Sequence, residues 1–406
     1  MPRIGEFIYP WGNGHYSRMS RLNEVLDGYV PGAEVHCSSK GDIYERLRRD
    51  LPEGLAHRIM MPTPIDGRMG PDVLRCMLNV ALPVSGNPPL VSQIASYLRE
   101  ERRLCDSSGF DIIVSDGDMG INVLARNRDI PSLFITNQFR PRLWASRFYF
   151  YPGLEFVSRQ IAKATRILVA DSPPPYTMCE FNLNLTAEAA RKTTYVGHFT
   201  RGRAAAPSPR SDLEGLIEGC DFGYWMRTGS ASTNDGTGRR YEEAFARMPD
   251  ERRIVSHARQ DPSIDSVLGR DGRRYAISEA YDRKVDWLQI DVGFLTEQEK
   301  DTVLEGCSYA VVNGSHTVMG EIMGGKRRPI IGMPVYDEHT NNLRWAERKG
   351  LGMLAGSASR AAAAVRRIRR EAESFREALD TFAENFSGDG AQNTARMVAE
   401  TLEQKR

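Results

Sequence analysis

The chain has 406 residues and a formal net charge of +1, with the composition of a soluble globular protein. This length favours two or three domains with substantial cores, and the near-zero charge argues against a nucleic-acid partner. The six cysteines are widely spaced without a CxxC pair, which predicts reduced thiols and neither a disulfide framework nor a zinc site. No apolar run reaches the roughly eighteen residues of a membrane-spanning helix, and the first residues lack a signal-peptide core. We therefore expect a cytoplasmic protein.

The N-terminal region combines a short strand with a glycine-bearing turn. Arg3–Tyr9 is the predicted strand, and Pro10–Arg18 is the predicted turn, which leads into a helix. Glycines let the backbone approach a ligand closely, and His15 follows the carboxyl end of the strand, where open α/β sheets bind ligands. The motif is not GxGxxG, because Ser17 stands at the third glycine position. A purely structural role for His15 is the alternative.

A second candidate group follows a buried strand. Phe110–Asp118 is strongly apolar and ends in two carboxylates, and a helix and the strand Pro131–Thr136 come after it. If these strands are parallel, Asp116 lies at the same sheet edge as His15. A carboxylate there would fix the tautomer of the imidazole and raise its basicity. The alternative role for Asp116 or Asp118 is that of a helix N-cap.

Gln138–Pro152 mixes arginines with aromatic residues. Such a segment suits an anionic membrane surface or an amphiphilic acceptor. The alternative is a helix that packs its aromatic side chains inward and leaves its arginines in solvent.

The composition of Arg201–Ser211, rich in small residues and proline, predicts a linker between two domains. We expect an N-terminal domain at 1–203 and a second domain at 212–386, where the α/β alternation restarts. A closing helix within 387–406 would pack back on the first domain. Two doubly wound halves place a ligand cleft between them.

Val311–Asn342 is the most informative stretch of the second half. A buried strand runs into a turn of small polar residues and then a helix, and this combination forms an anion site from free helix amides. Glu321 lies one turn inside the helix, within reach of a ribose hydroxyl. The strand Pro329–Met333 then leads to a predicted polar loop, Asp337–Asn342. An ordinary βαβ unit without a ligand is the alternative.

Two further helical patterns are clear. Thr296–Leu304 is a predicted helix in which Thr296 is the N-cap and Glu299 completes a capping box. Ser357–Phe386 is predicted as one long helical region, and Ala391–Lys405 as the closing amphipathic helix.

In order and spacing, these segments resemble GT-B glycosyltransferases over nearly the whole chain. The likeness is greatest to the enzymes grouped with the lipid-II-forming N-acetylglucosaminyltransferase, of the family 28/1 type, and their archaeal relatives. The donor pattern GGxST…E…G.P…P…EQ..NA stands here as Gly314-Ser315-His316-Thr317-Val318, Glu321, Gly325, Pro329, Pro334, Glu338-His339 and Asn342. Ser315, Val318 and His339 depart from that pattern.

The resemblance implies an α/β fold of two Rossmann-like doubly wound domains that face an interdomain cleft. It implies inverting, metal-independent transfer of a sugar from a nucleotide-sugar donor, expected to be UDP-linked, to an acceptor hydroxyl, without a cofactor. A polyprenyl- or lipid-linked acceptor would place the enzyme at the inner face of a membrane, although a soluble acceptor is equally compatible with the composition.

Transfer to an acceptor hydroxyl needs a general base, and we expect His15, supported by Asp116, to be that catalytic residue. The resemblance assigns roles to further residues. The residues expected to bind the donor nucleotide and diphosphate are Gly229, Ser230, Phe294, Leu295, Gly314, Ser315, His316, Thr317, Val318 and Glu321. Those expected at the donor sugar are Glu338, His339 and Asn342. Those of the acceptor-side loop are Gly12, Asn13, Gly14 and Arg18.

Two other functional classes stay open at this point. One is a UDP-sugar 2-epimerase, which shares the fold, although the chain lacks the Asp-Ser-Gly-Gly segment of those enzymes. The other is a non-catalytic module that binds a nucleotide sugar or a lipid head group.

Overall fold

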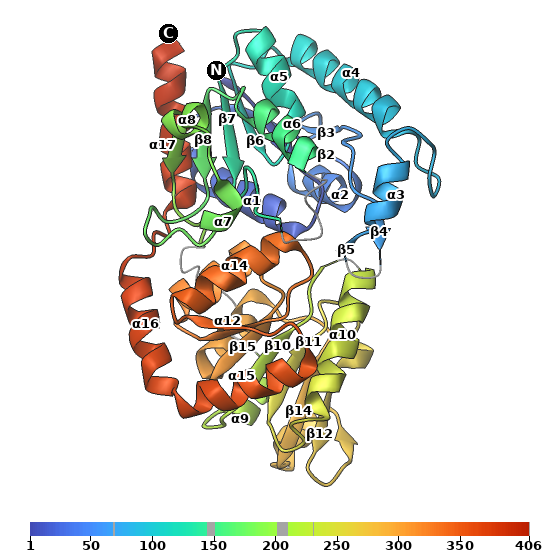
Figure 1. The fold of residues 1–406 in the computed structure, drawn as a ribbon, viewed down its shortest axis with the longest axis vertical. Helices are drawn as coiled ribbons and strands as arrows, with labels where there is room; N and C mark the ends of the chain where they lie inside the picture. Colours follow the sequence, from blue (N-terminus) through green and yellow to red (C-terminus); the bar gives the residue numbers. More distant parts are fainter. Residues whose placement is uncertain (68–69, 144–150, 201–209, 230, 406) are drawn as a thin grey trace. The chain divides into compact units, whose positions relative to one another are not determined.

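A computed structural model of the chain describes residues 1–67, 70–143, 151–200, 210–229 and 231–405. The chain divides into two compact units. Unit 1 comprises Met1–Asp66, Pro71–Arg201 and Ser387–Arg406, and unit 2 comprises Gly67–Gly70 and Gly202–Phe386. Each unit has its own largely parallel sheet with helices around it (Figure 1). The predicted α/β class with two Rossmann-like halves is therefore confirmed.

Unit 1 is built on a seven-stranded sheet in the order β3-β2-β1-β6-β7-β8-β9, in which all pairs are parallel. The strands are β1 (Arg3–Ile8), β2 (Glu34–Ser39), β3 (Ala56–Arg58), β6 (Ile112–Asp116), β7 (Ser132–Thr136), β8 (Arg166–Val169) and β9 (Thr193–Tyr195). The chain runs outward from β1 to β3 and then returns to place β6 beside β1. Open α/β sheets bind ligands at such a reversal, which in unit 1 lies at the carboxyl ends of β1 and β6. We call this place the crevice of unit 1.

Helices cover the sheet of unit 1, and they include the last helix of the chain. They are α1 (Asn13–Leu26), α2 (Gly41–Asp50), α3 (Val73–Leu78), α4 (Leu90–Ser108), α5 (Gly120–Asn127), α6 (Tyr151–Ile161), α7 (Glu180–Leu183), α8 (Ala187–Arg191) and α17 (Gly390–Lys405). The structure also contains a two-stranded sheet of β4 (Asp66–Gly67) and β5 (Gly70–Pro71). Leu22 of α1 and Val398 of α17 are fully buried in one apolar cluster with the strands, so residues from both ends of the sequence complete the same core.

Unit 2 has an eight-stranded sheet in the order β13-β12-β14-β11-β10-β15-β16-β17. Its strands are β10 (Gly223–Met226), β11 (Arg253–Ser256), β12 (Ser266–Gly269), β13 (Arg274–Tyr275), β14 (Trp287–Val292), β15 (Tyr309–Val312), β16 (Ile330–Gly332) and β17 (Gly352–Leu354). The antiparallel pairs are at one edge, where β12 pairs with both β13 and β14. The chain returns from the β14 side to place β15 beside β10, so the second crevice lies at the ends of β10 and β15.

The helices of unit 2 bury the large aromatic residues Trp225, Tyr241 and Phe245 against this sheet. They are α9 (Ser211–Ile217), α10 (Ala231–Phe245), α11 (Ile277–Asp282), α12 (Glu297–Gly306), α13 (His316–Gly320), α14 (Asp337–Arg348), α15 (Ala358–Arg370) and α16 (Ala372–Glu384). The 3-10 turn η2 (Pro262–Ile264) and the π-helical turn η3 (Glu321–Gly325) complete it. Within the part of the chain that the structure describes, no helix combines the length and apolarity needed to cross a bilayer.

Three predicted elements differ from the structure. Helix α1 starts at Asn13, directly after Gly12 with φ 78°, so most of the predicted N-terminal turn is helical. The predicted polar loop from Asp337 is wrong, because α14 begins there with two acidic residues in its first turn, where they complement the helix dipole. The long region Ser357–Phe386 is two helices that meet at Glu371.

Other predictions agree with the structure or lie outside it. The capping box at the start of α12 is confirmed, because Thr296 and Glu299 exchange both of its hydrogen bonds. Most of the predicted linker, residues 201–209, lies outside the described residues.

The shared core of unit 1 leads to a prediction about stability. Leu22→Ala should lower the free energy of unfolding by about 2–5 kcal/mol, because it removes a fully buried side chain and leaves a cavity. Urea unfolding followed by circular dichroism measures this loss. The matched control is Leu82→Ala, where the side chain is 57% exposed and the change should stay within about 0.5 kcal/mol. Equal effects of the two substitutions would contradict the assignment of Leu22 to the core.

Candidate functional site

A buried carboxylate joins an imidazole and a guanidinium at the crevice of unit 1. His15 Nδ1 lies 2.7 Å from Asp116 Oδ1. Arg18 donates to both oxygens of Asp116, from Nε to Oδ2 and from Nη2 to Oδ1, at 2.7 Å each. The side chain of Asp116 is fully buried and that of Arg18 is 6% exposed, whereas that of His15 is 19% exposed. The imidazole is therefore the member of this group that solvent or a substrate can reach.

The local fold explains why these side chains meet. Ile8 at the end of β1 pairs in register with Asp116 at the end of β6. Since α1 begins at Asn13, His15 and Arg18 are three residues apart on one helix face and both point to the same carboxylate. Gly117 has φ 81°, and a Cβ there would lie 2.8 Å from His15 Cε1. Only glycine leaves room for the imidazole on this turn.

The charges of this group reinforce one another. Burial acts to raise the pKa of Asp116, but Arg18 and His15 hold that pKa below its ordinary value of 3.8. Asp116 is therefore a carboxylate at neutral pH. Both Asp116 Oδ1 and Arg18 Nη2 contact His15 Nδ1, at 2.7 Å and 3.0 Å. The tautomer that carries its proton on Nδ1 would donate to Asp116 and present Nε2 as the acceptor, which is the arrangement of a general base.

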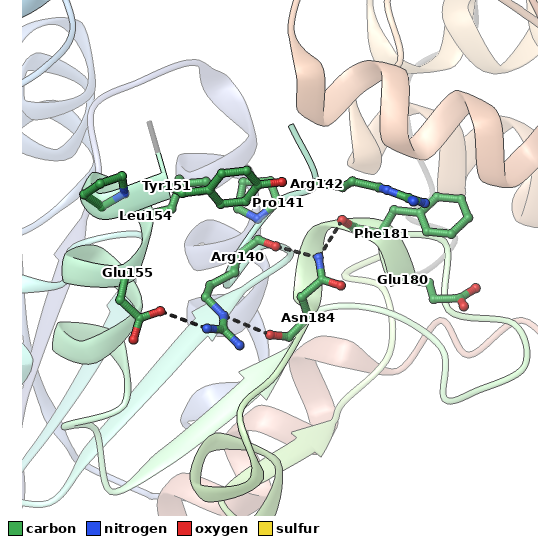
Figure 2. Close-up of a pocket in the computed structure, with 10 residues that line it drawn as sticks. Arg140, Pro141, Arg142, Tyr151, Leu154, Glu155, Glu180, Phe181 and Asn184 are labelled. Atoms are coloured by element: carbon green, nitrogen blue, oxygen red, sulfur yellow. Dashed lines mark hydrogen bonds and ion pairs between the residues drawn. The ribbon is translucent and has the colours of Figure 1, made fainter. Parts of the chain in front are cut away.

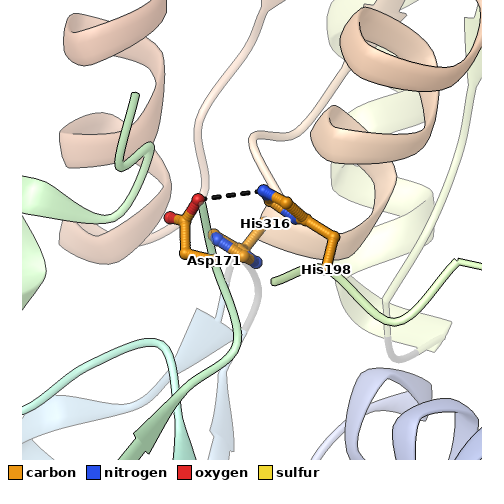
Figure 3. A group of neighbouring side chains, drawn as sticks. All are labelled: Asp171, His198 and His316. Carbon is orange, nitrogen blue, oxygen red and sulfur yellow. Dashed lines mark ion pairs between the residues drawn. The ribbon is translucent and has the colours of Figure 1, made fainter. Parts of the chain in front are cut away.

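Unit 1 contains a second histidine–carboxylate pair that the sequence analysis missed (Figure 3). His198 Nε2 lies 2.9 Å from Asp171 Oδ1, and Asp171 also accepts the amides of Ser172 and Cys179. The main chain of His198 is tied as well, because its amide donates to the Ser387 carbonyl at 2.7 Å. This main-chain hydrogen bond joins the segment at His198 to the residues that lead into α17. The apolar strand before Asp171 was the available signal, but nothing in the sequence marked His198 as its partner.

The wall of a cavity of about 870 Å³ in unit 1 includes part of the arginine- and aromatic-rich segment (Figure 2). Arg140 pairs with Glu155 at 2.8 Å, and Arg142 donates its amide to the Phe181 carbonyl. The apolar wall comes from Pro141, Tyr151, Pro152, Leu154 and Phe181. The aromatic residues Trp144, Phe148, Tyr149 and Phe150 lie outside the described residues. The described lining is thus amphiphilic, with two guanidinium groups and the carboxylates of Glu155 and Glu180 beside apolar surface.

In unit 2, polar side chains organise the turn that follows β15. Asn313 donates to Thr228 Oγ1 at 2.7 Å, and its Oδ1 accepts the amide of Ser315 at 3.0 Å. Gly314 has φ 98°, and its carbonyl accepts a hydrogen bond from Asn342 at 3.1 Å. These contacts set the turn from which α13 starts, at the end of the two strands that form the crevice of unit 2.

The structure places the predicted donor residues after three strands, β10, β14 and β15. His316, Thr317 and Val318 form the first turn of α13, and Glu321 follows and pairs with Lys300 at 2.8 Å. Phe294 is 51% exposed next to Leu295, after β14. Gly229 follows β10 with φ 101°, whereas Ser230 lies outside the described residues.

The predicted donor-sugar residues do not share one environment. Glu338 is half-buried in the first turn of α14. His339 is buried beneath Gly314, and burial lowers its pKa to about 3, so its imidazole is neutral. Asn342 is fully buried on the Gly314 carbonyl. His339 and Asn342 therefore support the turn after β15 from inside unit 2.

A further polar network of unit 2 was not predicted. His257 bridges Arg227 and Asp291, with Nδ1 2.6 Å from Arg227 Nη1 and Nε2 3.0 Å from Asp291 Oδ1. These residues stand at or just after the ends of β10, β11 and β14. Gly238 of α10 leaves the space that the Arg227 guanidinium fills.

Comparisons with known proteins agree with this architecture. No protein-family model matches the chain. An uncharacterized glycosyltransferase of Methanosarcina mazei is 26% identical over 238 residues, which cover 55% of this chain and 58% of that protein. The chain thus aligns with little more than half the length of that relative.

Solved glycosyltransferases share the fold of the whole chain. The glycotransferase of kitacinnamycin matches with a TM-score of 0.66 and 16% identity over 99% of this chain and 100% of its own. Phytolacca americana UGT2, complexed with UDP-2fluoro-glucose and pterostilbene, matches with a TM-score of 0.65 and 14% identity over 100% of both chains. The calicheamicin glycosyltransferase CalG4 matches with a TM-score of 0.63 and 13% identity over 100% of this chain and 99% of its own. The resemblance to GT-B glycosyltransferases is therefore confirmed for the fold.

The buried charges of unit 1 predict a pH-dependent stability. Asp116→Asn should cost about 3–5 kcal/mol near neutral pH, because it leaves the buried charge of Arg18 without its anionic partner. The folded-state pKa of Asp116 lies below the unfolded value, so its contribution is present above pH 3.8 and is lost as the pH falls through the folded pKa.

Urea unfolding of the wild type and Asp116→Asn at several pH values measures this dependence. The difference between the two proteins should be largest at neutral pH and should shrink on acidification. Asp106→Asn, at an exposed ion pair of unit 1, is the control and should change stability by about 0–1 kcal/mol. A difference for Asp116→Asn that stays constant at every pH would contradict the assigned charge state.

Proposed function

We propose that this chain is a GT-B glycosyltransferase that moves a sugar from a nucleotide-sugar donor to an acceptor hydroxyl, with His15 as general base. The observation that carries the proposal is the contact of His15 with buried Asp116 and Arg18 at the crevice of unit 1. The glycosyltransferase relative and the shared fold support the same reaction class.

In the proposed reaction, Nε2 of His15 takes the proton of the acceptor hydroxyl as its oxygen forms a bond to the anomeric carbon. The bond from that carbon to the diphosphate oxygen breaks, and the electron pair leaves with the nucleoside diphosphate. Asp116 stabilises the imidazolium that forms, and Arg18 keeps Asp116 ionised. Attack opposite the leaving group inverts the anomeric carbon in one displacement.

The donor is proposed to bind at the crevice of unit 2. The helical segment from His316 to Gly325 would direct its first amides to the diphosphate, and Glu321 with Lys300 would meet the ribose and a phosphate. Phe294 offers an exposed ring to a nucleobase. The complex of the structural relative UGT2 with UDP-2fluoro-glucose supports a UDP-linked sugar. We expect no metal requirement, so that EDTA leaves the transfer rate unchanged.

The acceptor is proposed to be amphiphilic. The lining of the cavity joins apolar surface to the guanidinium groups of Arg140 and Arg142 and to two carboxylates. Arg140 already pairs with Glu155, so Arg142 is the group proposed to meet an anionic part of an otherwise apolar acceptor. A polyprenyl- or lipid-linked acceptor has this chemistry and would bring the protein to a membrane surface.

The donor assignment is tested by a thermal-shift screen of UDP-, GDP- and TDP-sugars. A donor that binds the folded chain raises its melting temperature by mass action, and Glu321→Gln should reduce that shift. Glu305→Gln, which removes a similar exposed carboxylate paired with Lys326, is the control and should leave the shift unchanged. A wild-type chain that no sugar nucleotide stabilises would refute the donor site.

The base assignment is tested with labelled UDP-sugars, first without an acceptor. Slow hydrolysis by the wild type supports a transferase, isomerised sugar would support a 2-epimerase, and binding without turnover would support a non-catalytic module. His15→Gln should lower transfer about 10²- to 10⁴-fold, as expected for a lost general base, and should keep the donor-induced thermal shift. Unchanged transfer by His15→Gln would exclude His15 as the base.

A further inference from the structure

Three polar side chains meet behind the turn that carries Asp116, and the proposed reaction uses none of them. Tyr97 and Glu101 lie four residues apart on α4, and Asp118 follows β6. Their exposed fractions are 6%, 0% and 3%. The Tyr97 hydroxyl donates to Asp118 Oδ1, which also accepts the amide of Gly120 at 3.0 Å.

The two carboxyl groups cannot both be ionised in this setting. Burial, followed by the charge of Asp118, raises the pKa of Glu101 well above its usual range. Burial also raises the pKa of Asp118, although Glu101 and Tyr97 offset part of this effect. Apart from contacts within this group of three, both oxygens of Glu101 and Oδ2 of Asp118 are buried without a hydrogen-bond partner in the described part of the chain. One proton on Glu101, donated to Asp118, would satisfy both groups.

The turn from Asp116 to Gly120 is packed on one side by His15 and on the other by Tyr97. A Cβ on Gly120 would collide with the Tyr97 hydroxyl, and a Cβ on Gly117 would lie 2.8 Å from His15 Cε1. Between these glycines, the carbonyl of Asp118 accepts a hydrogen bond from Ser115 Oγ at 2.5 Å. A shift of Asp118 would therefore move Gly117, the residue that packs against the imidazole of His15.

We propose that Tyr97, Glu101 and Asp118 form a positioning cluster, in which one proton shared by two carboxyl groups holds the Asp116–Asp118 turn beneath His15. The cluster acts on the reaction only through His15, so its catalytic consequence rests on the proposed function. The other titratable groups that face it are Cys105 of α4 and, through Asp118, Tyr9 after β1. Both are uncharged at neutral pH, since burial raises the pKa of each.

The direct test is a proton titration of His15 by NMR on the full chain labelled at histidine, with the His15 resonance assigned from the spectrum of His15→Gln. Glu101→Leu removes the shared proton and should move the His15 pKa by roughly half a unit or more, since one unit corresponds to about 1.4 kcal/mol. Glu101→Gln keeps a donor of the same shape and should leave the titration as in the wild type. Glu45→Leu, at a helix side chain of unit 1 that is 58% exposed, is the control.

A purely structural role for Glu101 would lower the melting temperature without moving the His15 titration, and that result overturns the proposal. Glu101→Gln behaving like Glu101→Leu overturns it as well. If Glu101→Leu does not fold, Tyr97→Phe removes only the hydroxyl that binds Asp118 and should displace the His15 resonance in the same direction. An unchanged His15 resonance in Tyr97→Phe would then refute the cluster.

The activity arm uses hydrolysis of UDP-glucose and UDP-N-acetylglucosamine. Glu101→Leu should lower the rate about 10- to 100-fold, as for a displaced catalytic group, with an unchanged KM. The folded-state pKa of Glu101 lies above its unfolded value, so the shared proton is lost as the pH rises through the folded value. The wild-type rate should therefore fall as the pH rises through that folded value, and Glu101→Gln should lack that fall. If the wild type hydrolyses neither sugar, the proposed function is in question, and the NMR titration alone decides on the cluster.

Discussion

The carboxylate of Asp116 is the constraint around which the reactive edge of unit 1 is arranged. Removing a charge of this kind from water costs several kcal/mol, and only well-placed partners offset that cost. Here the partners are the fork of Arg18 and the imidazole of His15. Their positions depend in turn on the start of helix α1 at Asn13 and on the absence of a side chain at Gly117. The orientation of the imidazole is therefore a result of charge burial as well as of sheet topology.

The two units carry different side chains at the carboxyl ends of the strands where their sheets reverse strand order. Each sheet reverses its strand order beside its first strand, which leaves a crevice at the carboxyl ends. Unit 1 fills this place with a buried ion pair, which suits the transfer of a proton. Unit 2 combines neutral groups there, Asn313 with Thr228, with the network in which His257 bridges Arg227 and Asp291. In the proposed function, the first amides of the helix that follows would face an anion. One topology thus supports both halves of the proposed reaction.

Much of this could be predicted from the sequence, because apolar strands and the residues directly after them are local signals. His15 and Asp116 were expected together on that basis. The bidentate role of Arg18 was not, since the sequence Gly12-Asn13-Gly14 is equally compatible with a longer loop. The burial of His339 depends on the packing of α14 under Gly314, and the partner of Asp171 depends on a contact 27 residues away in the chain, between Asp171 and His198. Neither is visible in local patterns.

The return of α17 to unit 1 has a consequence for the order of folding during synthesis. One face of the unit 1 core consists of side chains from Ala391 to Leu402, which leave the ribosome only after all of unit 2 has been made. Until then, Leu22 and its neighbours on α1 lack their partners. Unit 2 is continuous apart from a few residues and can reach its native state first. The core of unit 1 is completed by contacts between α1 and α17, which are far apart in the sequence. Such contacts form slowly, so we expect the completion of unit 1 to be the slow step of folding. Until then, its apolar face is exposed to chaperones.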